Sequence, residues 1–190
     1  MLKNIIFNFI FIFIFSTNVN SITLDLGSTL LGDSGGGNFN LDETLELQDQ
    51  ILTDYLKGSS EFNKALVIIM DAYDLKDESA KLQSQQNFLD GSDIESSNFK
   101  DNMKEVAVLH KDSVKIIENK ISSGAKLDDA GKAKLATAYP PFFAGLVKTG
   151  LAAKLGLDTF KSIKDEGKKN PMVLTKFSNL MVIAKEVGTS

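Results

Sequence analysis

Residues 93–122, DIESSNFKDNMKEVAVLHKDSVKIIENKIS, decide the fold class of this chain. Seven side chains, all apolar except one histidine, recur along this stretch at spacings of three and four residues. This spacing places them on one face of an α-helix. These positions are Phe99, Met103, Val106, His110, Val114, Ile117 and Ile121. Ser92 or Asp93 is suited to cap the start of the helix, and Ser123-Gly124 is suited to close it. The pattern predicts one long helix with a single buried face.

Similar helical patterns lie on both sides of this stretch, and no sustained strand pattern occurs. The segments are 41–57, 59–73, 76–89, 128–139, 142–164 and 172–187. We expect Gly58 to end the first of them, with Ser59 or Ser60 capping the second. The sequence therefore predicts an all-α, single-domain bundle of six or seven helices over residues 41–190. Its centre should hold the most apolar segments, 62–73 and 142–155.

The stretch YPPFFAGLV, residues 139–147, is the most distinctive part of this helical region. Proline lacks a backbone donor and pushes the preceding residue away from helical angles, so Pro140-Pro141 should break the helix. The carbonyl groups freed near Ala136 and Thr137 must then find other partners. We hypothesise a groove for a ligand or a partner at this break. The alternatives are a tightly packed, kinked central helix and a membrane-inserting hairpin, which Lys148 and Lys154 would interrupt. The candidate site residues are Tyr139, Phe142 and Phe143.

The N-terminus has the pattern of a secretory signal peptide over residues 1–21. Lys3 precedes an apolar run at 5–15, which is shorter than the roughly 20 residues that a membrane-spanning helix needs. We expect cleavage near Ser21 and a location in a bacterial periplasm or outside the cell. Retention as a membrane anchor is the alternative. Residues 22–40 are rich in Gly and should form a flexible segment, or a short strand docked on the domain or a partner.

The composition argues against several classes of function. The chain has no Cys, which excludes disulfides, thiolate catalysis and Cys-ligated zinc. Every basic residue is Lys and the net charge is −4, so the chain has no evident affinity for nucleic acid or phosphate. The acidic clusters at 71–78 and 90–95 lack the spacing of a calcium loop, and no motif indicates a metal or a cofactor.

Two features could indicate catalysis. His110, the only imidazole, lies on the apolar stripe of the long helix, where it is either a hydrogen-bonded core residue or a catalytic base. No Gly-x-Ser-x-Gly turn accompanies it. Ser97-Asn98-Phe99-Lys100 and Lys148-Thr149-Gly150 imitate two serine β-lactamase motifs, but the element between them is missing and both lie in helical patterns. We interpret this match as coincidence.

The sequence thus favours a non-catalytic binding or scaffolding protein of the bacterial cell envelope, without a cofactor. Its partner would be another envelope protein or an apolar ligand, with no nucleic acid and no stable transmembrane span after signal removal. The alternative is a carrier of an apolar small molecule in a cavity near Phe142 and Phe143. A third hypothesis is a hydrolase that uses His110 with a nearby Ser or acid. A carrier requires a lined cavity, whereas a scaffold requires a filled core and an exposed apolar patch.

Overall fold

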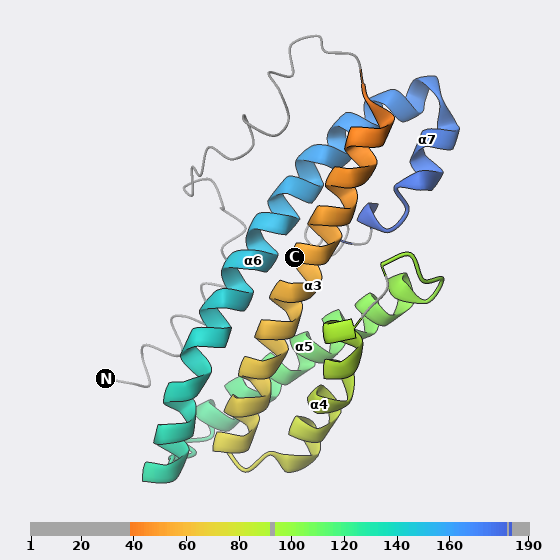
Figure 1. The fold of residues 1–190 in the computed structure, drawn as a ribbon. Helices are drawn as coiled ribbons and strands as arrows, with labels where there is room; N and C mark the ends of the chain where they lie inside the picture. Colours follow the sequence, from red (N-terminus) through yellow and green to blue (C-terminus); the bar gives the residue numbers. More distant parts are fainter. Residues whose placement is uncertain (1–38, 92–93, 182, 184–190) are drawn as a thin grey trace.

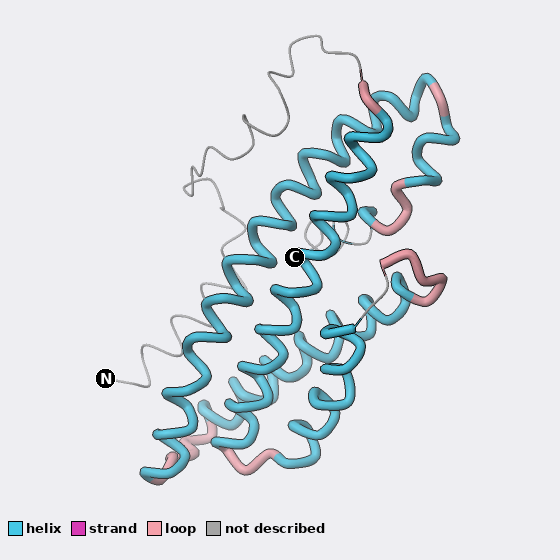
Figure 2. The backbone as a smooth tube through the Cα atoms, viewed as in Figure 1, coloured by secondary structure: helices cyan, strands magenta, loops and turns pink. Residues whose placement is uncertain are grey.

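The structure, a computed structural model, describes residues 39–91, 94–181 and 183 (Figure 1). These residues form helices joined by turns and include no strand (Figure 2). The helices are α3 (Leu41–Ala72), α4 (Lys76–Gly91), α5 (Phe99–Ser122), α6 (Asp129–Lys169) and α7 (Pro171–Lys176). The predicted all-α class is confirmed for this part of the chain. The expected signal peptide (1–21) and nearly all of the expected Gly-rich segment (22–40) lie outside the described residues.

Helices α3 and α6 lie side by side and antiparallel, and they form the long axis of the molecule (Figure 1). Their backbones touch at two glycines. A Cβ atom at Gly58 would come within 2.6 Å of the Thr149 backbone nitrogen, and one at Gly145 within 2.5 Å of the Phe62 backbone nitrogen. Only glycine permits so close an approach. These contacts therefore set the register of the two helices.

The contact at Gly58 explains why the predicted end of the first helix is wrong. Helix α3 continues from Leu41 to Ala72 without a break. Gly58 is buried within it, and Ser59 and Ser60, expected as caps, are also buried in mid-helix. Gly58 serves helix packing rather than termination. Two predicted helices thus merge into one. The described residues contain five helices, so the predicted count of six or seven is not confirmed.

The core of the described region has two clusters of buried apolar side chains. One joins the first half of α3 to the second half of α6 and the C-terminal segment; it includes Ile51, Leu52, Ile163, Phe177 and Leu180. The other joins the second half of α3 to α4, α5 and the start of α6; it includes Leu66, Met70, Leu82, Ile117 and Leu135. The predicted central position of 62–73 is confirmed, because most of its apolar side chains are buried. The segment 142–155 buries only one face.

Several predicted boundaries are confirmed and others are wrong. Helix α4 occupies its expected place, and α5 ends at Ser122 before Gly124, whose φ of 83° is the left-handed conformation that glycine favours. Helix α6 begins near residue 128 as expected, and Asp128 caps it, since its Oδ1 accepts a hydrogen bond of 2.7 Å from the Gly131 backbone nitrogen. Helix α5, however, begins at Phe99, because residues 94–98 form turns. The proposed caps Ser92 and Asp93 lie outside the described residues.

The single C-terminal helix predicted over 172–187 is wrong in its described part. Asn170 caps α7, and residues 177–179 then form a turn. This turn directs Phe177 into the core, where it has no exposed surface. Among the described residues, no helix combines the length and the hydropathy needed to cross a bilayer.

Candidate functional site

Helix α6 runs through Pro140 and Pro141 as one continuous helix, so the predicted break is wrong (Figure 1). The two prolines remove the backbone donors that would bond to the carbonyl groups of Ala136 and Thr137. Both of these residues are exposed, so water can satisfy their carbonyl groups. The packing of α6 on α3 continues below and above this point. The cost of two lost hydrogen bonds is therefore offset without interrupting the helix.

The three predicted site residues follow one another along α6 but do not point the same way. Phe142 is half buried and packs against Phe62 of α3, with ring centroids 5.6 Å apart. Phe143 lies on the other side of the helix ridge, 42% exposed, with its ring perpendicular to that of Phe142. Tyr139 is half buried. Phe142 thus belongs to the core, whereas Phe143 belongs to the surface.

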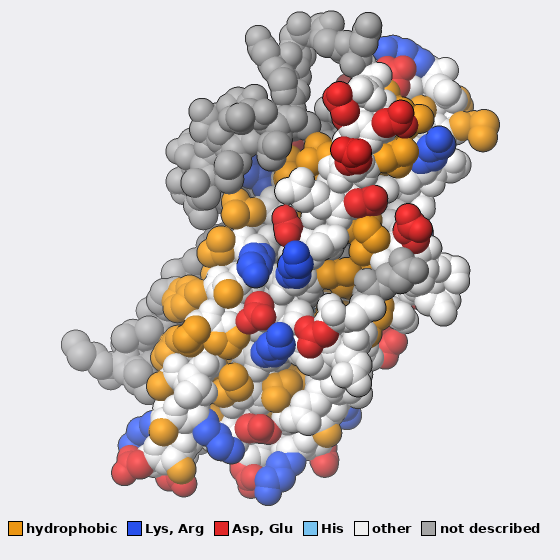
Figure 3. All heavy atoms as spheres, viewed as in Figure 1, with side chains coloured by type: hydrophobic (Ala, Val, Ile, Leu, Met, Phe, Trp, Pro, Cys, Tyr) orange, Lys and Arg blue, Asp and Glu red, His pale blue; other side chains and the backbone are white. Residues whose placement is uncertain are grey.

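Phe143 is part of an apolar stripe along the outward face of α6. We define the α6 stripe by its exposed positions, Ala136, Pro140, Phe143, Val147 and Gly150, which repeat at spacings of four and three residues. Val147 is 54% exposed. No charged residue occurs from 135 to 147, so about three helical turns of this face are uncharged. Hydrophobic side chains line the outer edge of α6 in Figure 3.

A hollow of about 290 Å³ lies elsewhere, between α4 and α5. Its lining is largely polar or charged and comes from Lys81, Ser84, Gln85, Glu105, Val108, Leu109 and Asp112. Gln85 donates to Glu105 across it at 3.1 Å. None of the three predicted site residues lines this hollow.

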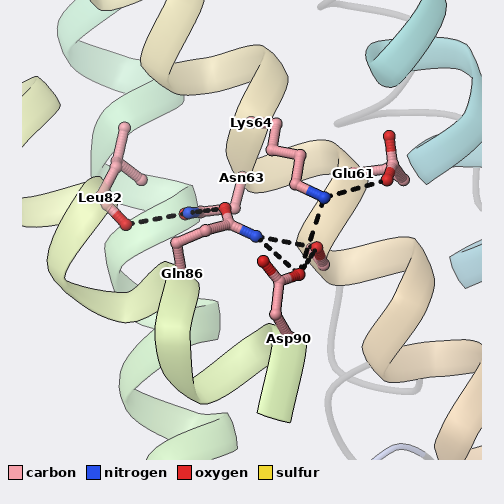
Figure 4. Close-up of polar contacts among 7 residues, drawn as sticks. Glu61, Asn63, Lys64, Leu82, Gln86 and Asp90 are labelled. Atoms are coloured by element: carbon pink, nitrogen blue, oxygen red, sulfur yellow. Dashed lines mark hydrogen bonds and ion pairs between the residues drawn. The ribbon is translucent and has the colours of Figure 1, made fainter.

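A network of buried and part-buried hydrogen bonds links α3 to α4 (Figure 4). It continues from Asn63 to His110 of α5. Asn63, which has no exposed surface, donates from Nδ2 to the Leu82 carbonyl at 2.9 Å and to Gln86 Oε1 at 2.8 Å. Gln86 Nε2 in turn donates to Ser60 Oγ at 2.8 Å and to Asp90 Oδ1 at 3.0 Å. Both amide side chains are therefore oriented by their partners.

The same hydrogen-bond network determines the tautomer of His110. Because both Nδ2 hydrogens of Asn63 are used, its Oδ1 must accept, and the Nε2 of His110 must donate across the 3.1 Å between them. The ring of Phe62 lies edge-on against the imidazole, with centroids 5.3 Å apart. Burial lowers the pKa of His110 to about 4. The neutral tautomer with its proton on Nε2 is therefore the stable form near neutral pH.

In this hydrogen-bond network, Ser60 does not touch His110, because Gln86 and Asn63 lie between them. The hydroxyl of Ser60 donates to Asp90 at 2.5 Å, and this hydrogen bond lowers the pKa of the Asp90 carboxyl. Lys64 Nζ lies 3.6 Å from the same carboxylate. Among the described residues, no Ser, Asp or Glu is hydrogen-bonded to His110, so the geometry does not assemble a nucleophile and its base.

In the part of the chain that the structure describes, no three His, Asp or Glu side chains converge as a metal site would require. Comparisons with protein-family models, with curated proteins and with solved structures found no match to this chain. The function must therefore be argued from the geometry alone.

The hydrogen-bond network from Ser60 to His110 was not predicted from the sequence. Ser60 and Asn63 share a helix face with Leu56 and buried Ser59 and Leu66, and polar residues at such positions signal a buried hydrogen-bond partner. The partners themselves come from α4 and α5, and no spacing within one helix identifies them.

Proposed function

We propose that the protein is an exported, non-catalytic binding or scaffolding protein of the bacterial cell envelope, and that it binds its partner through the α6 stripe. The observation that carries this proposal is the exposure of Phe143 and Val147 on an uncharged helix face above a filled core. Contiguous exposed apolar surface is costly in water and is typical of interaction sites. The stripe would contribute the apolar centre of an interface, with lysines at its rim.

The binding mode follows from the shape of the surface. The α6 stripe is a ridge on one helix, so the natural complement is a surface that packs helix ridges into grooves. Phe143 is the anchor, because aromatic side chains dominate the energy of interfaces. Within the described part of the chain, the surroundings of Gly150 are open, with nothing within 4 Å of the position of a Cβ, so a partner backbone can approach closely there.

The role of the stripe can be tested by photo-crosslinking in the cells that produce the protein. A photoreactive phenylalanine analogue at position 143 should give a discrete adduct, whereas the same analogue at Lys111 on α5 should not. The partner, identified by mass spectrometry and purified, should bind the wild-type chain and lose at least about tenfold in affinity for Val147→Asp. Equal adducts at both positions, or binding that Val147→Asp leaves unchanged, would contradict the proposal.

The proposed location has its own test. The intact mass of the protein recovered from the envelope fraction should correspond to a chain that lacks residues 1 to about 21. A retained Met1 in an integral membrane fraction would favour the anchor instead.

A further inference from the structure

The charges of α3 and α6 are segregated along the sequence. The first part of α3, residues 41–54, contains five acidic residues and no basic one. Residues 130–157 of α6 contain four lysines and no acidic residue. In Figure 3, acidic side chains gather over the first half of α3. A chain of net charge −4 thus carries a strongly acidic helix end and a separate basic, apolar helix face.

Several other lysines are paired locally. Lys64, Lys104, Lys132, Lys161, Lys168 and Lys169 each pair with an acid three residues earlier. Among the described residues, no ion pair involves the acids of 41–54 or three of the lysines of 130–157. The acids are Asp42, Glu43, Glu46, Asp49 and Asp54, and the lysines are Lys134, Lys148 and Lys154. Within the described part of the chain, two groups of opposite charge are thus left without an ion pair.

The antiparallel arrangement keeps the apolar middle of the stripe away from the acidic segment. Gly58 faces Thr149, and Ile51 faces Gly156, so the acidic part of α3 is level with the second half of α6, and Lys154 is level with its last acid, Asp54. At a rise of about 1.5 Å per residue, Phe143 in the middle of the α6 stripe lies roughly 25 Å along the helix axis from the middle of the acidic segment. Phe143 can therefore meet the acidic segment only in a second copy.

We propose that the α6 stripe of one copy binds the acidic first half of α3 in a second copy, so that the chains associate head to tail. This inference rests on the proposed function, because it names the partner of the same stripe. Lys148 and Lys154 would face Glu46 and Asp49 of the neighbour. Phe143 and Val147 would pack beside the half-buried Leu45 and Leu47, which flank the acidic face.

Such a contact joins two different surfaces, so each copy keeps one free surface of each kind. Head-to-tail contacts of this type grow into rings or open filaments rather than stopping at a twofold dimer. Opposite charges at the interface accelerate encounter and set the register, while the apolar residues hold the complex. Salt should weaken the association, since the Debye length falls from about 10 Å at 0.1 M to about 3 Å at 1 M.

The test is a charge-reversal series on the chain as recovered from the producing cells, measured by sedimentation equilibrium at low and high salt. Lys148→Glu with Lys154→Glu should weaken self-association about tenfold or more, and so should Glu46→Lys with Asp49→Lys. The chain that carries all four reversals should regain self-association, because the attraction is restored with opposite signs. The control, Lys111→Glu with Lys115→Glu on α5, changes net charge equally and should have no such effect.

Three results would overturn the proposal. The wild-type chain could stay monomeric at all concentrations, neither double charge reversal could weaken self-association, or the chain with all four reversals could fail to regain self-association. The photo-crosslinking experiment separates this failure from that of the proposed function. An adduct at position 143 with a different protein, from a chain that remains monomeric, would leave the stripe as a binding site and remove only the second copy as its partner.

Discussion

Gly145 of α6 lies against the backbone of Phe62 in α3, so closely that a Cβ atom there would come within 2.8 Å of the Gly58 carbonyl oxygen and closer still to the Phe62 nitrogen. Both contacts are with backbone atoms, which cannot move aside as a flexible side chain can. This close contact between backbones therefore lies only two residues from the exposed ring of Phe143.

Gly145→Ala should destabilise the protein by about 2–3 kcal/mol, because the added methyl group forces α3 and α6 apart. The matched control is Gly150→Ala on the same helix, where no neighbouring atom of the described residues lies within 4 Å of the new Cβ. This control should stabilise by about 0.5–1 kcal/mol through helix propensity. Urea unfolding followed by circular dichroism measures both changes. Equal effects of the two substitutions would contradict the close packing described above.

Asn63→Leu should cost about 2–4 kcal/mol, since it leaves the Leu82 carbonyl, Gln86 and His110 without a hydrogen-bond partner. Adding His110→Leu should recover part of that loss, because it removes one of the stranded polar groups. A double-mutant cycle by urea unfolding gives the coupling energy. Gln85→Ala, which breaks only an exposed hydrogen bond, is the control and should stay within about 0.5 kcal/mol. If the effects of Asn63→Leu and His110→Leu are strictly additive, the hydrogen bond between Asn63 and His110 is contradicted.

Stability should fall as the pH is lowered from about 6.5 to 4. The pKa of His110 is lowered to about 4 by burial, so the unfolded chain takes up the proton first and gains free energy over this range. The contribution is present above pH 6.5, is lost as the pH falls, and amounts to at most about 3 kcal/mol because His110 retains some contact with solvent. His110→Gln should remove this part of the pH dependence in urea titrations. Parallel curves for the two proteins would show that His110 does not titrate in this range.

Pro140→Ala and Pro141→Ala should each stabilise the protein by about 1–2 kcal/mol. Each restores a backbone donor to the continuous α6, and the gain exceeds the greater flexibility of the unfolded chain. Thermal and urea unfolding measure the change. Loss of stability in both variants would contradict this prediction. It would indicate that the helix is broken at the two prolines, as the sequence predicts.

The local period of apolar residues was enough to predict the helical class, the place of α4 and the start of α6 near residue 128. Gly58 and Pro140-Pro141 were interpreted wrongly for one reason. A glycine or a proline has a local preference to end a helix, but here the neighbouring helix decides the outcome. That neighbour is distant in sequence, so no local pattern could reveal the contact between Gly58 and Thr149.

The structure separates two of the predicted site residues. The sequence identified Phe143, but it grouped this residue with Phe142, which faces the core of the continuous helix. In an unbroken helix, consecutive residues point about 100° apart, so the two rings cannot line one groove. The hydrogen-bond chain from Ser60 to His110 was missed because its members come from three helices.

The pairing of α3 with α6 also governs the order in which the chain can fold. In the sequence, α4 and α5 lie between α3 and α6. Helix α3 is therefore synthesised long before its main partner, and such long-range contacts slow folding. During that interval its apolar face has only the shorter helices to cover it. A chain stopped before Asp129 should therefore remain unfolded or aggregate, and its apolar α3 face needs protection until α6 has been synthesised.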